Sequence, residues 1–216
     1  FTSYGHQKYD ELTYNGFYRR FEEFENFPEM AGKDIRAYFN FDVEAGEELL
    51  VKMALSNVST AGALKNMEAE VPHWDFDAVH EATKAKWNQE LAKIEVEPIQ
   101  AEDLETFYTA MYHTCLAPVL YEDVDGQYRG LDQNIHQSED FEHYTIFSLW
   151  DTYRALHPFF NLVQPSRNND MIKSMLAHQE QSVHGMLPIW SHYANENWCM
   201  IGYHATSVIA DAAAKE

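Results

Sequence analysis

Apolar and polar residues alternate along two neighbouring stretches near the start of the chain, residues 35–43 and 49–55. Alternation places every second side chain on the same face of an extended backbone, so each stretch is predicted to be a half-buried β-strand. The intervening Ala45-Gly46-Glu47 is typical of a turn, and the pattern therefore predicts an antiparallel hairpin. Its apolar face would contain Ile35, Ala37, Phe39, Phe41 and Val43 from the first strand and Leu49, Val51, Met53 and Leu55 from the second.

After residue 59 the hydrophobic period changes to that of an α-helix. Ser59 is a favourable N-cap residue for a helix predicted over residues 61–70. A longer surface helix is predicted over residues 77–93, where apolar residues recur at helical intervals between charged ones. Asp75 or Asp77 can cap this second helix. The first third of the chain is thus predicted to change from strands to helices.

The period stays helical beyond Pro98, where we place a domain boundary, because the residue before a proline is biased away from helix. A long loop containing the turn signal of residues 123–130 separates the first two helices of this region, and loops of such length in compact domains are usually functional. The four predicted helices cover residues 104–115, residues 144–158, about residues 170–184, and a last stretch from near Asn197 through Ala212.

The composition narrows the range of partners. Of the 216 residues, 45% are hydrophobic, which is enough for a packed core. The 35 acidic and 15 basic residues give a formal net charge of −20, which repels phosphate backbones and anionic lipid headgroups. We therefore expect no nucleic-acid partner and no membrane span. The two cysteines, Cys115 and Cys199, are predicted to be buried thiols, and their spacing does not show whether they pair.

Residues 144–158 carry the densest chemistry in the chain: an acid, Asp151, a base, Arg154, and five aromatic rings. Aromatic faces stack on pyranose rings, while carboxylates and guanidinium groups make bidentate hydrogen bonds with neighbouring hydroxyls. The segment thus fits sugar recognition. An ordinary amphipathic core helix has the same spacing of Trp, Phe and Leu, so the pattern alone leaves both interpretations open.

Candidate metal ligands are scattered along the sequence. His113, His157 and His204 form no His-x-x-x-His pair, so we do not predict a zinc site. Asp123 and Asp125 precede a glycine, as in some calcium loops, but no glutamate stands at the spacing that an EF-hand requires. A turn is therefore favoured for this loop.

Several motifs stand in a characteristic order from about residue 30 onward. They are Lys52-Met53-Ala54-Leu55-Ser56, the helix of residues 63–70 with Asn66 and Glu70, Asp75-Phe76-Asp77 followed by Trp87-Asn88, the run Phe107 to His113, Gly126-Gln127-Tyr128-Arg129-Gly130, the run Phe147 to Arg154, the run Gly185 to Trp190, and Met200-Ile201-Gly202-Tyr203-His204. This ordered set resembles glycoside hydrolase family 92, the calcium-dependent exo-acting α-mannosidases found mainly in glycan-degrading bacteria.

The resemblance implies an α+β multidomain fold. Residues 1–58 would be the end of an N-terminal β-sandwich, residues 59–98 linker helices, and residues 99–216 the first helices of an (α/α)6 barrel. Such a barrel has twelve helices and the pattern predicts about four here, so we expect an incomplete portion of the family's chain. Helices that lack their neighbours are expected to expose apolar surface.

The resemblance also implies a set of substrate-binding residues. Asp151 would lie in the subsite that holds the terminal mannose, with Trp150 and Arg154 lining the same pocket. Arg154 either contacts the sugar or holds Asp151 through an i, i+3 ion pair on a helix. Glu196 matches an acidic position of the family and is the fourth predicted substrate-binding residue, although N-capping of the last helix explains it equally well.

For activity, the resemblance implies calcium-assisted, inverting hydrolysis of terminal α-linked mannose in glycans. The general acid, the general base and the ligands of Ca²⁺ are expected beyond residue 216, so we expect this chain to be inactive alone and to need the remainder of its own enzyme. The implied location is secreted, periplasmic or at the cell surface, and the sequence carries no signal-peptide pattern. Two alternatives are a non-catalytic carbohydrate-binding or scaffold fragment and another (α/α)6 glycan-degrading enzyme.

Overall fold

The computed structural model describes residues 39–97 and 100–215. The chain divides into two units, residues 1–49 and 50–216, and each is considered by itself. In the first unit the amide of Glu47 donates a hydrogen bond to the carbonyl of Glu44 (3.1 Å), which closes a turn. Gly46 has a φ of +90° in this turn, a conformation that glycine adopts without strain. The predicted turn is thus confirmed.

The strand predicted over residues 35–43 is wrong over its described part. Residues 39–43 form no strand, and Phe39, Phe41 and Val43 are all exposed. Ile35 and Ala37 lie outside the described residues. A strand needs a neighbour to pair its backbone groups and to cover its apolar face, and the described residues of this unit provide none.

The second half of the predicted hairpin is wrong for the same reason. Residues 50–58, at the start of the second unit, are extended but belong to no described strand. Val51, Met53 and Leu55 are 79%, 83% and 80% exposed, while the residues between them are half-buried. The sequence alternation is therefore present in space with its apolar side facing solvent.

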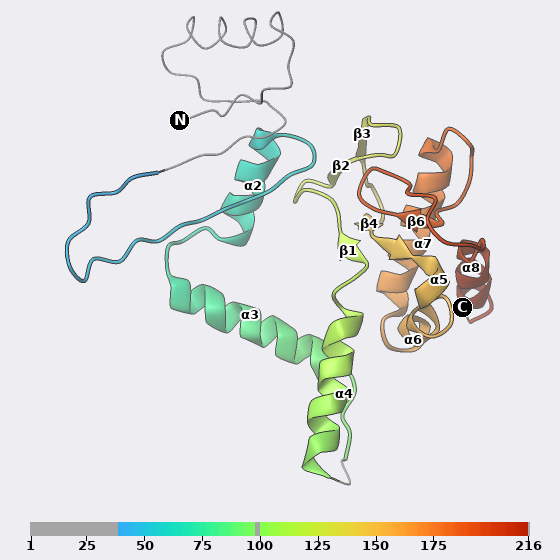
Figure 1. Ribbon diagram of the computed structural model, residues 1–216, viewed down its shortest axis with the longest axis horizontal. Helices are drawn as coiled ribbons and strands as arrows, with labels where there is room; N and C mark the ends of the chain where they lie inside the picture. Colours follow the sequence, from blue (N-terminus) through green and yellow to red (C-terminus); the bar gives the residue numbers. More distant parts are fainter. Residues whose placement is uncertain (1–38, 98–99, 216) are drawn as a thin grey trace, which may run out of the picture. The chain divides into compact units, whose positions relative to one another are not determined.

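Three helices follow, and all of them were predicted. They are α2 (Thr60–Glu70), α3 (Phe76–Leu91) and α4 (Ala101–Thr114) (Figure 1). Ser59 caps α2 by accepting a hydrogen bond from the Gly62 amide (3.0 Å). Asp75, rather than Asp77, caps α3 through the amide of Ala78 (2.9 Å). Trp87 and Tyr112 join α3 to α4, with their ring centroids 4.8 Å apart.

Beyond α4 the described chain forms antiparallel ladders of two short strands each, which the helical pattern did not predict. They join β1 (Val119–Leu120) to β4 (Tyr144–Thr145), β2 (Gln127–Arg129) to β3 (Ile135–Gln137), and β5 (Phe147–Ser148) to β6 (Trp190–Ser191). The β2–β3 hairpin occupies the region that was predicted to be a long loop. Every ladder is short because its strands contain only two or three residues.

The single helix predicted over residues 144–158 is wrong. The chain passes through β4 and β5 into the short helix α5 (Leu149–Thr152) and then into α6 (Leu156–Val163). Ile146 lies between the two strands with a φ of +66°, which is incompatible with a right-handed helix. Thr145, Ile146 and Phe147 are also β-branched or aromatic, and such residues favour extended backbone.

The last two helices confirm two predictions, with one changed boundary. Helix α7 (Pro165–Gln181) has proline in its first turn, where a missing N–H leaves no hydrogen bond unmade. Helix α8 (Ala205–Ala213) begins well after the predicted start near Asn197. Met200 and Gly202 have φ values of 70° and 96°, so the chain cannot be helical before residue 203.

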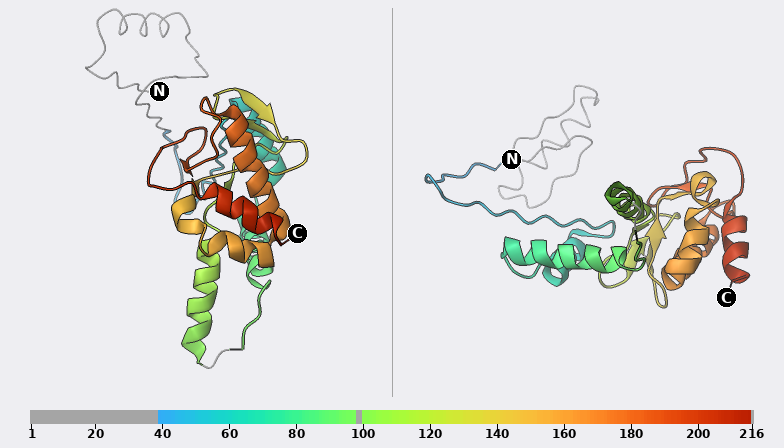
Figure 2. Two further views of the ribbon diagram at one scale, coloured as in Figure 1. Left: turned by 90° about the vertical axis from the view of Figure 1, so that its right-hand side faces the viewer. Right: turned by 90° about the horizontal axis from the view of Figure 1, so that it is seen from below.

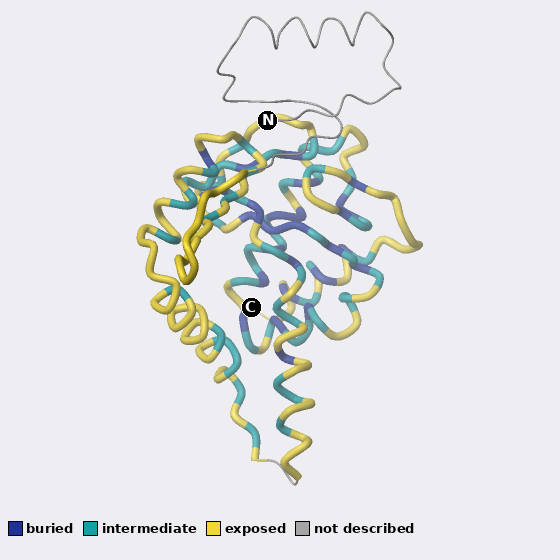
Figure 3. Tube along the Cα trace, turned by 60° about the vertical axis from the view of Figure 1, so that its left-hand side comes forward, coloured by how far each residue is buried: buried dark blue, intermediate teal, exposed yellow. Residues whose placement is uncertain are grey.

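The core lies where α6, α7 and α8 pack against β4, β5 and one another (Figure 2). Its fully or nearly fully buried apolar members are Phe147, Leu149, Phe160, Met171, Met175 and Val208. Figure 3 shows the contrast with α3, which is mostly exposed along its length. No described helix combines the length and the apolar character that a membrane crossing requires.

Both cysteines are free thiols, with Cys115 half-buried and Cys199 exposed. The prediction of two buried thiols is therefore wrong, because Cys199 lies in the irregular segment before α8 rather than inside a helix. The domain boundaries predicted after residues 58 and 98 remain predictions. Residues 98 and 99 lie outside the described part of the chain.

Candidate functional site

Asp151 lies on α5, at the surface of the core. The hydroxyl of Ser148, the last residue of β5, donates a hydrogen bond to Asp151 Oδ2. Between these two residues Leu149 is fully buried, which anchors the first turn of α5 to the core. The Asp151 carboxylate is therefore exposed to solvent but attached to a well-packed element.

Trp150 and Arg154 lie beside Asp151 and have contacts of their own. Trp150 is half-buried, and its carbonyl accepts a hydrogen bond from the guanidinium of Arg154 (3.5 Å). The Arg154 guanidinium also lies 5.7 Å from the centroid of the Tyr153 ring. Within the described structure, Arg154 and Asp151 thus have different partners. The i, i+3 ion pair that the spacing allowed is not formed.

Glu196 is buried, and its carboxylate holds the loop that follows β6. Oε2 accepts a hydrogen bond from the amide of Ile189, and Oε1 accepts from the amides of Trp190 and Trp198, each at 3.0 Å. Ser191 pairs with Glu196 across this loop. The alternative that Glu196 caps the last helix is wrong, because α8 begins only at Ala205.

His178 brings α7 into the same cluster. Its Nε2 lies 3.5 Å from Glu196 Oε2, and both side chains are more than nine-tenths buried. Burial lowers the pKa of His178, and the neighbouring carboxylate of Glu196 opposes that shift. The carboxylate of Glu196 therefore lies between loop amides on one side and an imidazole on the other.

The β5–β6 ladder brings the four predicted site residues into one neighbourhood. Ser148, which holds Asp151, is paired with Trp190, whose amide Glu196 holds. Trp150 and Arg154 follow directly on α5 and the turn after it. Residues more than 40 positions apart in the sequence are therefore joined through a single pair of strands.

Sequence reasoning missed the conformation of the loop between β6 and α8. Tyr193, Trp198 and Met200 have φ values of 55°, 54° and 70°, which bulky residues rarely adopt. Such strained positions concentrate at functional sites and persist only where the surroundings fix them. His204, at the end of the loop, stacks on Tyr153 with centroids 4.1 Å apart and rings 10° from parallel. Aromatic residues in this stretch were the available signal.

Residues 62–216 of the chain match the family model described as the glycosyl hydrolase family 92 catalytic domain. The chain belongs to glycosyl hydrolase family 92. This agrees with the resemblance of the ordered motifs. A comparison with curated proteins found no match.

Solved structures of family 92 members resemble the chain as well. One is a family GH92 α-mannosidase from Bacteroides thetaiotaomicron, 54% identical, with a TM-score of 0.67 over 72% of this chain and 21% of that one. Its complex with mannoimidazole gives a TM-score of 0.70. An inverting family GH92 mannosidase from the same organism is 30% identical, with a TM-score of 0.68 over 74% of this chain and 21% of that one. The chain thus spans about a fifth of the length of these structures.

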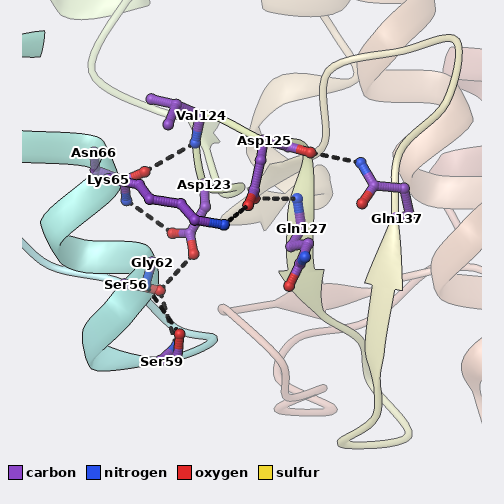
Figure 4. Close-up of polar contacts among 10 residues, drawn as sticks. All are labelled: Ser56, Ser59, Gly62, Lys65, Asn66, Asp123, Val124, Asp125, Gln127 and Gln137. Carbon is purple, nitrogen blue, oxygen red and sulfur yellow. Dashed lines mark hydrogen bonds and ion pairs between the residues drawn. The ribbon is translucent and has the colours of Figure 1, made fainter. Parts of the chain in front are cut away.

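A second polar cluster of this family 92 chain joins α2 to the loop before β2 (Figure 4). We call it the α2 latch: Ser56, Gly62, Asn66, Asp123 and Val124. Asp123 is buried and accepts hydrogen bonds from the Ser56 hydroxyl (2.7 Å) and the Asn66 amide group (2.8 Å). The Val124 amide donates to Asn66 Oδ1 (2.9 Å). At Gly62 a Cβ would overlap the Asp123 carboxylate, so this close approach requires glycine.

Asp125 adds an exposed ion pair to the same face. Its Oδ2 lies 2.7 Å from Lys65 Nζ on α2, and its carbonyl accepts a hydrogen bond from Gln137 (2.6 Å). The hydrogen bond and charge of Lys65 lower the pKa of Asp125. Asp123 and Asp125 therefore engage α2, and the turn favoured for this loop is confirmed by the bond from the Gly126 amide to the Asp123 carbonyl (2.8 Å).

The histidines considered as metal ligands serve other contacts. His157 Nδ1 makes a hydrogen bond with Asn168 Oδ1 (2.8 Å) in the core, and His204 stacks on Tyr153. Among the described residues no group of three or more His, Cys, Asp or Glu side chains is arranged to hold a metal ion. These residues therefore do not by themselves fit a Ca²⁺ site, and no chemical step is assigned to the ion here.

Proposed function

We propose that the protein carrying this chain is a glycoside hydrolase that removes terminal α-linked mannose from glycans. Membership of family 92 supports this proposal, together with 54% identity to an α-mannosidase over 72% of the chain. Because the chain spans about a fifth of that enzyme, the proposed activity belongs to the whole protein. Mannose-containing glycans would be its substrates, at a secreted, periplasmic or cell-surface location.

Within that enzyme, this chain would contribute part of the pocket for the terminal sugar. Asp151 would accept hydrogen bonds from adjacent hydroxyls, Arg154 would donate to ring or hydroxyl oxygens, and Trp150 would contribute an aromatic face. Glu196 would shape the pocket from the opposite strand. The observation that carries this assignment is the β5–β6 ladder, which joins the Asp151 turn to the Glu196 loop.

The mechanism we propose is inverting, by analogy with the 30% identical inverting mannosidase. An inverting glycosidase needs a carboxylic acid to protonate the leaving oxygen and a carboxylate to activate water, about 6.5 to 9.5 Å apart. We propose that this pair and the ligands of a catalytic Ca²⁺ come from parts of the protein outside this chain. The proposed architecture is a β-sandwich, linker helices and an (α/α)6 barrel, of which residues 99–216 would supply the first helices.

The test is hydrolysis of an aryl α-mannoside by the full-length natural protein, with calcium and with a chelator. Hydrolysis that produces inverted mannose and stops on chelation is the expected result, and an aryl α-glucoside serves as the matched control substrate. Mannose binding without hydrolysis would indicate a carbohydrate-binding scaffold. Turnover of another glycan without calcium would indicate a different (α/α)6 enzyme. Either outcome would contradict the proposed activity.

A further inference from the structure

The three amides held by Glu196 come from both ends of one loop. Ile189 and Trp190 lie at the start of β6, and Trp198 lies eight residues further along the chain. All three donor–acceptor distances are 3.0 Å, and the Glu196 side chain is only 5% exposed. Hydrogen bonds to an ionised acceptor are stronger than those between neutral groups. One carboxylate thus clamps the loop closed.

The clamped loop has a conformation that its own sequence does not favour. Tyr193 and Trp198, on either side of Glu196, both have positive φ values. Left-handed backbone at bulky side chains is costly and persists only when surrounding contacts impose it. The hydrogen bond from the Trp198 amide to Glu196 Oε1 is such a contact at one of these residues. Loss of the carboxylate would therefore release the loop as well as its amides.

The clamp also connects to the acid of the proposed sugar pocket. Glu196 holds the amide of Trp190, and Trp190 is the partner of Ser148 in the β5–β6 ladder. Ser148 donates its hydroxyl hydrogen bond to Asp151. A change in the position of β6 would thus move β5 and with it the orientation of the Asp151 carboxylate.

We infer that Glu196 is a positioning residue, which sets the geometry of the sugar pocket without touching the sugar. Its two oxygens are taken up by three amides and lie beside His178, and the side chain is buried. The residues that it positions are Trp190 directly and Asp151 through the ladder. This inference rests on the proposed function, since it concerns a pocket for a terminal mannose.

The first test compares Glu196→Gln with Glu180→Gln in the full-length natural protein. Glu180 is an exposed acid on α7, so it serves as the matched control. Glutamine has nearly the same shape but replaces one acceptor oxygen by a donor, so it disrupts the clamp. We expect an increase in KM for an aryl α-mannoside of roughly 10-fold to 100-fold, as misplacement of about 1 Å produces. Glu180→Gln should leave KM and kcat unchanged.

Mannosides that lack single hydroxyl groups distinguish positioning from direct contact. If Glu196 only positions the pocket, the Glu196→Gln penalty should be the same for the 2-, 3-, 4- and 6-deoxy aryl mannosides. If Glu196 touches the sugar, the penalty should disappear for the analogue that lacks the contacted hydroxyl, and the inference would be wrong. Double-mutant comparisons of this kind isolate a direct interaction.

Amide hydrogen exchange provides a readout that does not depend on activity. Peptides covering residues 187–199 should exchange faster in Glu196→Gln than in the wild type or in Glu180→Gln, because the amides lose their acceptor. Unchanged exchange would overturn the inference. Should Glu196→Gln fail to fold, Glu196→Asp keeps the charge, and its faster exchange in the same peptides tests the clamp. If the wild type hydrolyses no mannoside while exchange responds as expected, the proposed function fails and the clamp stands.

Discussion

The helical core and the α2 latch are held in place by different forces. In the core, α6, α7 and α8 bury large apolar side chains such as Phe160 and Met175. Helix α2 buries only Gly62 and is attached through the carboxylate of Asp123 and the side chain of Asn66. Burial of apolar surface stabilises without fixing direction, whereas hydrogen bonds fix both distance and angle. The core thus supplies stability and the latch supplies register.

This difference leaves apolar surface near the latch. Val51, Met53 and Leu55 line an open groove of ≈ 700 Å³ together with Trp74 and Phe76. A polar latch holds one side of the segment and does not cover its other side. The exposure agrees with the expectation that helices of a partial architecture show apolar faces. The predictions below test the comparison from the largest expected effect to the smallest.

The largest effect is expected in the helical core. Phe160→Ala removes a side chain that is 2% exposed, and we expect the free energy of unfolding to fall by about 3 to 5 kcal/mol. Leu162→Ala on the same helix is the matched control, because Leu162 is 76% exposed and its loss should change stability by less than about 0.5 kcal/mol. Urea unfolding measures both. Equal effects would contradict the packing of α6.

The next effect concerns the latch. Gly62→Ala would push a methyl group into the Asp123 carboxylate, and we expect a loss of about 2 to 3 kcal/mol from overpacking and disrupted hydrogen bonds. Asp123→Ala removes the group that is overlapped. In the background of Asp123→Ala, the further change Gly62→Ala should therefore cost much less. Additive losses in this double-mutant cycle would show that the two residues do not meet.

A pH effect of intermediate size is expected from a buried histidine between the two regions. His143 stacks on Tyr128 at 3.7 Å, its Nδ1 has no hydrogen-bond partner, and burial lowers its pKa to about 3. The unfolded chain takes up the proton near pH 6.5 and the native state does not, so stability is full above pH 6.5 and is lost as the pH falls toward 3.

Between pH 7.5 and pH 5 this one group should cost about 2 kcal/mol, which His143→Phe should abolish while keeping the stacked ring. His80 is exposed on α3, and His80→Gln is the control that should keep the wild-type slope. Urea unfolding at the two pH values gives the comparison. A wild-type slope in His143→Phe would assign the acid sensitivity to other groups.

The smallest effect is expected from the exposed ion pair of the latch region. Lys65→Met removes the partner of Asp125 at a site open to solvent, so the free energy of unfolding should change within experimental error. The pKa of Asp125 should rise toward its ordinary value, which NMR titration can follow. A destabilisation as large as that of Gly62→Ala would mean that charge, rather than the buried hydrogen bonds, holds α2.

The sequence predicted the helices better than the strands, for a physical reason. Helix α3 was predicted from its period and from Asp75 as a possible cap, because helical hydrogen bonds are local. The strands over residues 35–43 and 49–55 were wrong where they are described, because pairing depends on a partner that local alternation does not reveal. Similarly, the helix predicted through Ile146 was wrong because its positive φ follows from tertiary contacts.

The candidate site was predicted in its residues but not in its construction. Asp151, Trp150, Arg154 and Glu196 came from the resemblance to family 92, and their roles in binding remain predictions. Spacing suggested an ion pair between Asp151 and Arg154, whereas the partners are Ser148 and the Trp150 carbonyl. The three amides of Glu196 were not predictable, since backbone donors leave no trace in a sequence.

The central claim is that the Asp151 turn binds the terminal sugar of a mannoside. The most direct measurement is kcat/KM for an aryl α-mannoside with full-length Asp151→Asn and Asp140→Asn. Asp140 is an exposed acid paired with Lys173 and serves as the control. We expect Asp151→Asn to lower kcat/KM by about 100-fold or more with an unchanged melting temperature, and Asp140→Asn to match the wild type. Equal kcat/KM values for the wild type and Asp151→Asn would contradict the claim.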